Sequence, residues 1–240
     1  MEQSQLLFLD IEATGLDTNT AEIIEFCART PETMIINKLF RPSKNANQFG
    51  KNNIIPFEVS GVTNITDDDV KDKKVFDPKN EELKSGYKFV AVAHNVEYDL
   101  PVLARYGINF TDSICTLKLS QYLYPQLANH KLGTLRAFFG IQVSGGAHRA
   151  DYDVEILIEV YNKIANGRTM QEMILLSKEA RDSLKADKLE IWQFGKFKGQ
   201  KINLKNLEHR SYARWYLTQP ENPQYPRDKE FVEKLKLSLI

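Results

Sequence analysis

The sequence has no long hydrophobic run, few cysteines and no net charge, and each of these features limits the classes of protein to which the chain can belong. No stretch of about 18 apolar residues occurs in the 240-residue chain, which excludes a membrane-spanning helix. The two cysteines, Cys27 and Cys115, are too few for a disulfide scaffold, and their flanks predict buried strand or core positions. The N-terminal MEQSQLLFLD lacks the basic start and cleavage site of a secretory signal, so we expect a cytoplasmic protein with reduced thiols.

The charged residues balance overall but are unevenly distributed along the chain. Residues 171–240 contain 14 Lys and Arg against 10 Asp and Glu, so the acidic excess falls in residues 1–170. This asymmetry predicts an acidic body followed by a basic C-terminal module.

Strand and helix patterns are mixed over residues 1–166. Apolar and β-rich runs predict strands at 5–10, 22–30, 34–41 and 87–93, the second and third forming an antiparallel hairpin closed by Pro31. Helical patterns are present from 94 through 103, and then at 116–123, 132–139 and 150–165. We therefore predict an α/β domain whose mixed sheet is flanked by helices.

The rest of the chain predicts a connector and a small module. Residues 167–188 have the pattern of a helical connector, and residues 189–240 that of a small α+β module. Within the module, IWQFGKFKGQKI is interpreted as two short strands, and SYARWYLTQ and KEFVEKLKLSLI as two short helices.

The first strand ends in two acids, Asp10 and Glu12, which face the same way because strand side chains alternate. Two like charges at this spacing repel each other, and a shared divalent cation would remove that cost. Two solvated acids at a strand end are the simpler interpretation of this segment alone. The following Ala13–Leu16 forms a tight turn whose backbone N–H groups could face an anionic ligand.

A second group of polar residues follows the strand at 87–93. Asn95 and Asp99 are four residues apart and therefore share one face of the predicted helix. Asp99 could act only as a favourable charge near the helix start. Ligands in α/β sheets nevertheless bind at the carboxyl ends of strands, where these residues are expected.

A third group combines a loop histidine with a helical acid. His148 follows a glycine-containing loop, and Asp153 falls in the first turns of the next helix. A histidine on a loop beside a fixed carboxylate suits a general base. In isolation, an exposed loop histidine followed by a helix-start acid is the better interpretation of the segment.

Together, FLDIEATGL, AHNVEYDLPVL and HRADYDVEIL resemble the three motifs of the DEDDh (DnaQ-like) 3′→5′ exonucleases, in the family's order. The resemblance covers about residues 5–165 and implies a ribonuclease H-like sheet. Beyond it, FGKFKGQK followed by SYARWYL resembles the C-terminal module of bacterial exonuclease X proteins.

The resemblance implies a two-metal phosphodiester hydrolase. Four carboxylates bring a charge that two Mg²⁺ ions balance, and oxygen ligands without cysteine suit Mg²⁺ or its substitute Mn²⁺. It implies that Asp10 and Glu12 contact both ions, that Asp153 holds one ion, and that Asp99 supports the other. His148 would accept the proton of the attacking water.

Contacts to the substrate are expected at the turn and in the C-terminal module. The resemblance suggests that Thr14 and Leu16 hold the 3′-terminal nucleotide and that Asn95 reaches the next one, although Leu16 could equally be a core residue. Lys196, Lys198 and Lys201 alternate with Trp192, Phe194 and Phe197 and could contact phosphates and bases. The aromatics could instead form the module's own core, but we favour nucleic-acid contact.

We therefore predict an exonuclease that releases nucleoside 5′-monophosphates from DNA 3′ ends, with no membrane association. An RNA-trimming enzyme of the same family is the alternative within this chemistry. A catalytically silent protein that binds nucleic acid or a polymerase is the alternative outside it.

Overall fold

The computed structural model describes residues 5–80, 89–143, 150–192, 194–204, 206–220 and 227–237. They fall into two units, Met1–Ala180 and Arg181–Ile240. The first unit extends beyond the predicted boundary at residue 166, because Met173, Ile174 and Ala180 pack into its core. Within the described residues, no helix has both the length and the apolar character needed to cross a membrane.

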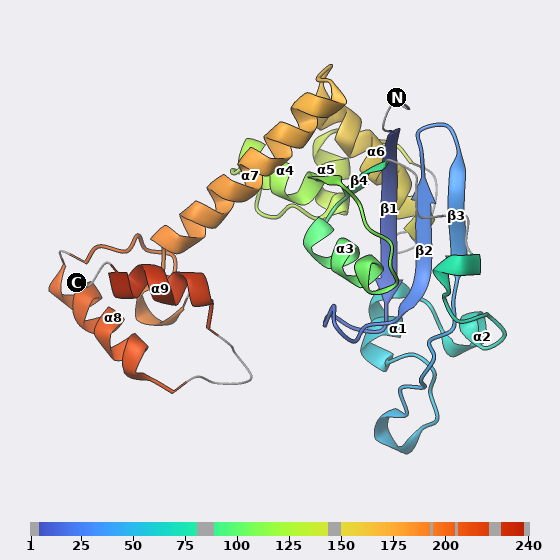
Figure 1. Cartoon of the computed structure of the whole chain (residues 1–240), viewed down its shortest axis with the longest axis horizontal. Coiled ribbons are helices and arrows are strands. Elements are labelled where there is room, and N and C mark those ends of the chain that lie inside the picture. The colour runs from blue at the N-terminus through green and yellow to red at the C-terminus, as the bar shows by residue number, and fades with distance from the viewer. Residues whose placement is uncertain are drawn as a thin grey trace. The chain divides into compact units, whose positions relative to one another are not determined.

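A five-stranded mixed sheet forms the centre of the first unit (Figure 1). Its strands are β1 (Gln5–Ala13), β2 (Ile23–Arg29), β3 (Met34–Leu39), β4 (Phe89–Ala93) and β5 (Asp112–Cys115). The strand order is β3-β2-β1-β4-β5. β2 pairs antiparallel with β1 and β3, while β4 is parallel to β1 and β5. The predicted hairpin and mixed sheet are confirmed.

Helices cover both faces of this sheet. The helices of the chain are α1 (Phe57–Thr63), α2 (Asp67–Val70), α3 (Val96–Arg105), α4 (Thr116–Leu123), α5 (Leu132–Phe138), α6 (Ala150–Ala165), α7 (Met170–Glu190), α8 (Leu207–Thr218) and α9 (Lys229–Leu237). Short 3₁₀ turns occupy Gln48–Gly50, Pro78–Asn80 and Gly195–Phe197. The helices predicted after residue 94 are confirmed, whereas α1 and α2 were not predicted.

The alternation of β1 side chains separates two hydrophobic cores. Phe8 packs on one face with the apolar stripe of α6, including Leu157 and Tyr161. Leu7, Leu9 and Ile11 pack on the other face with residues of α3. Figure 1 shows α6 and α3 on opposite faces of the sheet. Both cysteines are buried and free, in β2 and β5, as predicted.

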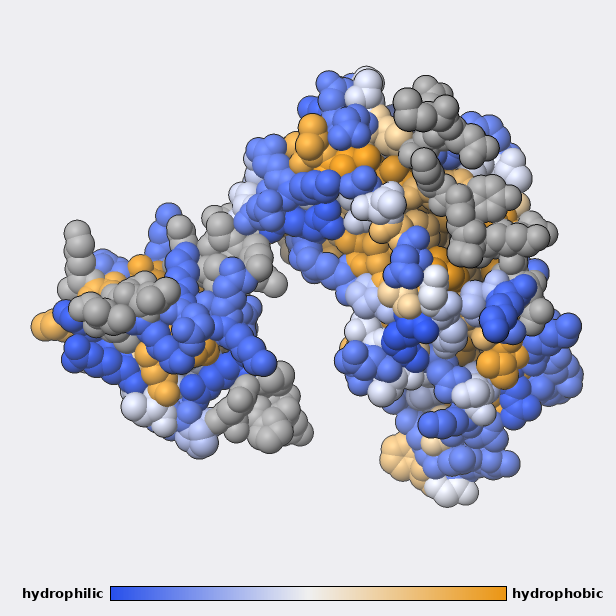
Figure 2. Space-filling model, in the orientation of Figure 1, coloured by the Kyte–Doolittle hydropathy of each residue, from blue (hydrophilic) through white to orange (hydrophobic). Residues whose placement is uncertain are grey.

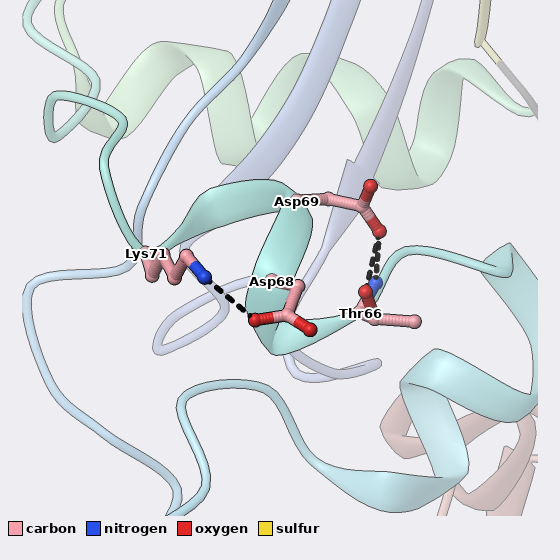
Figure 3. A network of polar contacts seen from close by, with 4 residues as sticks. All are labelled: Thr66, Asp68, Asp69 and Lys71. Atoms are coloured by element: carbon pink, nitrogen blue, oxygen red, sulfur yellow. Dashed lines mark hydrogen bonds and ion pairs between the residues drawn. The ribbon is translucent and has the colours of Figure 1, made fainter.

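Local polar contacts hold the segment around α2. The Asp69 carboxylate accepts hydrogen bonds from the backbone N–H (2.8 Å) and hydroxyl (2.6 Å) of Thr66, and Lys71 pairs with Asp68 at 2.9 Å (Figure 3). Asp67 accepts the N–H groups of Ile54 and Ile55, which ties the preceding loop to the helix. Such capping contacts let a helix of only four residues form.

The second unit is built around Trp192, which is fully buried. Phe197, Ala213, Phe231 and Leu235 complete its core, and they come from the 3₁₀ turn, α8 and α9. The two predicted strands were wrong for the described residues of IWQFGKFKGQKI. There, pairing is limited to one antiparallel bridge between Ile191 and Lys201, because Phe194 and Phe197 turn inward around Trp192 instead of alternating along strands.

Candidate active site

Three of the predicted carboxylates converge beside the C-terminal half of β1. Asp10 and Glu12 lie on the sheet face covered by α6, as the alternation predicts, and Asp153 comes from the first turns of α6. One carboxylate oxygen from each of these residues lies within 4.8 Å of the others. All three side chains are partly buried, so the cluster is not a set of solvated surface acids.

Asp99 joins the cluster from α3, which follows the carboxyl end of β4. Its side chain is only 4% exposed, and its carboxylate accepts a hydrogen bond from the backbone N–H of Ile11. Its charge acts on Asp10, so it is more than a helix-start charge. The structure thus brings together Asp10, Glu12, Asp99 and Asp153, as the sequence predicts.

A fifth carboxylate at the site, Glu25 on β2, was not predicted from the sequence. Glu25 is 1% exposed and lies directly across from Glu12 in the antiparallel register of β1 and β2. Its carboxylate accepts the backbone N–H of Ala150 at 3.0 Å, at the first residue of α6. A single acid inside the apolar run IIEFCAR is the signal that could have identified it. Glu25 therefore fixes the start of the helix that carries Asp153.

Mutual repulsion and burial make these acids hard to ionise together. Burial raises the pKa of Asp10 well above 3.8, and the charges of Asp99 and Glu12 raise it further. Burial, followed by the charge of Asp153, raises the pKa of Glu12 from 4.5 to about 7. Burial raises the pKa of Asp99 to about 7, against the lowering effect of the Ile11 hydrogen bond.

This donor set fits divalent metal ions. Clustered carboxylate oxygens with raised pKa values gain most from a cation that neutralises them, and oxygen donors match Mg²⁺ and Mn²⁺. Asp10, Glu12 and Asp153 are close enough together to hold one ion, and Asp99 lies beside Asp10.

The turn after β1 is held rigidly against α3. The Tyr98 hydroxyl donates to the Gly15 carbonyl at 2.5 Å, and Arg105 donates to the carbonyls of Thr18 and Ala21. Leu16 is 92% exposed, so it is not a core residue. An exposed leucine on a fixed turn next to an acidic cluster is positioned to contact a ligand.

Two other predicted substrate contacts flank this turn. The Thr14 N–H donates to the Glu22 carbonyl at 2.9 Å, and the Thr14 hydroxyl accepts the Glu22 N–H at 2.9 Å. The Thr14 N–H is therefore engaged in closing the turn. Asn95 is exposed at the residue that precedes α3.

The predicted general base, His148, lies outside the described residues. The described chain resumes at Ala150, where α6 begins, one turn before Asp153. Of the remaining histidines, His94 bonds Thr116 Oγ1 (3.0 Å) and the carbonyl of His130 (2.7 Å), and burial lowers its pKa to about 4. His209 accepts the indole N–H of Trp192 at 3.2 Å. His94 and His209 therefore have structural contacts that account for them.

Two of the three aromatics predicted to stack on bases do not reach the surface, and the third, Phe194, is partly buried against the same core. Trp192 is fully buried and Phe197 is 7% exposed, because they form the core of the second unit. This part of the prediction was wrong. Lys196, Lys198 and Lys201 are exposed around that core, and their contact with nucleic acid stays a prediction.

Sequence comparisons relate the chain to nucleases. A family model described as exonuclease matches residues 7–161. The DNA polymerase III subunit epsilon of Aquifex aeolicus is 31% identical over 167 residues, which cover 65% of this chain and 78% of that protein. A PolC-type DNA polymerase III of Caldanaerobacter subterraneus is 30% identical over 172 residues, which cover 68% of this chain but 12% of that much longer protein.

Solved structures share the fold. A structure of exonuclease X in complex with 5′ overhanging duplex DNA is similar with a TM-score of 0.55 at 24% identity, over 72% of this chain and 99% of that one. The nuclease domain of 3′hExo, a DEDDh family member bound to rAMP, is similar with a TM-score of 0.51 at 18% identity, over 69% of this chain and 93% of that one. These similarities confirm the predicted ribonuclease H-like fold.

The matched region contains the strands and helices that carry all four converging acids. The coverage of the family model, the epsilon-subunit relative and the shared fold agree with the motif order in the sequence. The chain therefore belongs to the DEDDh (DnaQ-like) exonuclease family, whose members act on nucleic acid and depend on divalent metal ions.

Proposed function

We propose that this protein is a 3′→5′ exonuclease that hydrolyses phosphodiester bonds at DNA 3′ ends and releases nucleoside 5′-monophosphates. The observation that carries the proposal is the convergence of Asp10, Glu12 and Asp153, with oxygens within 4.8 Å, beside the buried Asp99. Such a cluster is costly in a folded protein without bound cations, and phosphoryl transfer is a reaction that uses them.

In this proposal the carboxylates hold two Mg²⁺ ions, with Mn²⁺ as a substitute. Bound metal ions supply positive charge to the attacking and leaving oxygens of an in-line displacement at phosphorus. Asp10 and Glu12 would contact both ions, Asp153 would hold the first and Asp99 would support the second. Glu25 keeps Asp153 in place through the Ala150 N–H.

His148 is proposed as the general base. It precedes Asp153 by five residues, which matches the family's third motif. A neutral imidazole near pH 7 can accept the proton of the attacking water, and loss of such a base costs about 10²- to 10⁴-fold in rate.

The turn after β1 is proposed to hold the 3′-terminal nucleotide. Leu16 would pack against the last base, the main-chain carbonyl of Thr14 would contact its sugar, since the Thr14 N–H is bonded to Glu22, and Asn95 would reach the next nucleotide. The exposure of Leu16 and the rigid attachment of its turn support this placement. These contacts do not distinguish one base from another, so binding should be independent of sequence.

DNA is favoured over RNA as the substrate. The epsilon-subunit and PolC-type relatives are DNA polymerase components, and the exonuclease X structure contains duplex DNA. An RNA-trimming exonuclease is the competing possibility.

The test uses end-labelled DNA and RNA oligonucleotides, single- and double-stranded, incubated with Mg²⁺ or EDTA. We expect 5′-labelled DNA to shorten stepwise from its 3′ end, with mononucleotide products and no cleavage in EDTA. Asp10→Ala should abolish cleavage, whereas Asp68→Asn, which removes an exposed acid on α2, should retain it. Near-normal turnover of Asp10→Ala would overturn the assignment, and preferential shortening of RNA would overturn the DNA preference.

A further inference from the structure

The second unit has a pocket that the proposed nuclease chemistry does not use. It has a volume of about 420 Å³ and is lined by Lys196, Leu207, Glu208, Ser211, Tyr212 and Trp215. Five of these residues come from one side of α8, in two rows with spacings of three or four residues, one through Leu207, Ser211 and Trp215 and the other through Glu208, Tyr212 and Trp215. The pocket therefore belongs to the second unit alone.

The pocket exposes apolar and aromatic side chains that a small core would ordinarily bury. Trp215 is 52% exposed and Leu207 is 78% exposed, whereas Trp192 is fully buried. Trp215 stacks on Tyr212, with ring centroids 5.2 Å apart and planes inclined by 29°. The visible surface of this unit is otherwise mainly hydrophilic, with small apolar patches (Figure 2).

Tyr212 is held in place by the core beneath it. Its ring packs edge-on against Trp192 (5.1 Å) and Phe197 (5.2 Å). Gly195 has a left-handed φ of +66°, and a Cβ there would overlap the Tyr212 hydroxyl at 1.7 Å. A larger residue at Gly195 would displace the tyrosine. Trp215 is thus stacked on a fixed aromatic support.

Positively charged residues outnumber negatively charged ones in the part of the chain that carries this aromatic pair. Residues 191–237 contain ten Lys and Arg against five Asp and Glu. Lys196 lines the pocket and pairs with Glu208 there at 3.8 Å. The exposed Arg210 and Arg214 lie on α8 three and seven residues after Leu207, on the neighbouring face of the helix. Stacking rings beside cations are the combination that proteins use to bind single-stranded nucleic acid.

We propose that the Trp215–Tyr212 pair is a stacking site for an unpaired base of single-stranded nucleic acid, with Lys196, Arg210 and Arg214 contacting the flanking phosphates. The inference rests on the proposed function, which supplies the class of ligand. Ser211 offers a hydroxyl group to the edge of a base, while the Glu208 carboxylate pairs with Lys196. The excess of positive charge favours this ligand over an apolar segment of a partner protein.

The test measures binding of the full-length protein in EDTA, where the substrate stays intact, to a (dT)₂₀ oligonucleotide and to a blunt 20-base-pair duplex. Trp215→Leu keeps an apolar side chain but removes the ring, and Trp215→Phe keeps a ring as the matched control. Loss of one stacked base should weaken (dT)₂₀ binding by about 5- to 100-fold in Trp215→Leu. Trp215→Phe should retain most of the affinity, and duplex binding should change by less than about twofold in both variants.

Intrinsic fluorescence provides a second readout, because Trp192 and Trp215 are the two tryptophans of the chain. We expect (dT)₂₀ to quench the emission of the wild type and to leave that of Trp215→Phe, which retains the buried Trp192, unchanged. Equal (dT)₂₀ affinity of the wild type and Trp215→Leu would overturn the proposal and leave the pocket to a protein partner. Equal weakening in Trp215→Leu and Trp215→Phe would also overturn it.

Nuclease assays on the same proteins separate the two proposals. If Asp10→Ala abolishes cleavage while the Trp215 variants bind (dT)₂₀ normally, the stacking site is wrong and the proposed function stands. If Asp10→Ala cleaves normally while Trp215→Leu loses (dT)₂₀ affinity, the proposed function is wrong and the stacking site stands.

Discussion

Replacing Asp10 by asparagine should stabilise the metal-free protein at alkaline pH. The variant keeps the shape of the side chain and removes one charge from the acidic cluster. Two unit charges 4.8 Å apart repel each other by about 3 kcal/mol at an effective dielectric constant of 20. Raising the pKa of Glu12 from 4.5 to about 7 corresponds to a similar cost, about 3 kcal/mol. Because the side chains are partly exposed and water screens them, we expect a gain of about 2 kcal/mol at pH 8.5.

The sign of the pH dependence follows from the direction of the pKa shifts. The folded-state pKa values of Asp10, Glu12 and Asp99 are raised, those of Glu12 and Asp99 to about 7. The cost of ionising Glu12 and Asp99 is therefore absent below about pH 4 and grows as the pH rises through about 7. At pH 5, below the pKa values of about 7 of Glu12 and Asp99, these two neighbours of Asp10 are largely protonated in the folded protein, and Asp10→Asn should change stability little. The advantage of the variant should therefore appear between pH 5 and pH 8.5, and Mg²⁺ should reverse it by stabilising the wild type alone.

Urea unfolding in EDTA, followed by circular dichroism at pH 5 and pH 8.5, measures this difference. Both tryptophans lie in residues 181–240, so tryptophan fluorescence follows the second unit and should show the same midpoint in both proteins. Asp68→Asn is the matched control, since Asp68 is exposed and its ion pair with Lys71 is worth at most about 1 kcal/mol. The electrostatic reasoning would be refuted if Asp10→Asn were less stable than the wild type at pH 8.5. It would also be refuted if the variant differed in stability from the wild type by the same amount at pH 5 and pH 8.5.

Three further predictions concern residues around the cluster. Glu25→Ala should lower kcat by about 10- to 100-fold because Asp153 is misplaced. Glu25→Gln, whose amide oxygen still accepts the Ala150 N–H, should retain most of the wild-type kcat. An equal loss of kcat in both variants would argue against this positioning role. His148→Ala should slow turnover by about 10²- to 10⁴-fold with Mn²⁺ binding unchanged by calorimetry, and loss of Mn²⁺ binding would make His148 a ligand. Leu16→Ser should raise KM for single-stranded DNA by about fivefold, because an apolar contact with the last base is lost. The urea midpoint should not change, because Leu16 is 92% exposed. An unchanged KM would remove Leu16 from the substrate site.

Local patterns were enough to predict the part of the site that lies on single elements. The alternation of β1 places Asp10 and Glu12 together, and the helical period of α6 places Asp153 on the side opposite solvent. The meeting of these elements with Asp99 was predicted only through the family resemblance, because no local pattern states which strands are neighbours.

Features that depend on tertiary register were missed. Glu25 belongs to the site only because β2 pairs with β1 in the register that sets it opposite Glu12, and because α6 begins at its carboxylate. In the second unit, the run IWQFGKFKGQKI predicted two short strands, but packing around Trp192 prevailed over this weak local preference. Trp215 was not singled out, since the sequence does not tell which tryptophan a small core will bury.

The strand β1 couples the acidic cluster to both hydrophobic cores, which explains why the site tolerates its own repulsion. Leu9 and Ile11 bury their side chains on one face, while the N–H of Ile11 holds the carboxylate of Asp99. A slip of one residue would exchange Asp10 and Glu12 with these apolar side chains and place two carboxylates in the core. A change of register that separated the carboxylates would therefore cost more free energy than their mutual repulsion does. The fold keeps the acids together, and at a pH above their raised pKa values bound cations are the means of neutralising them.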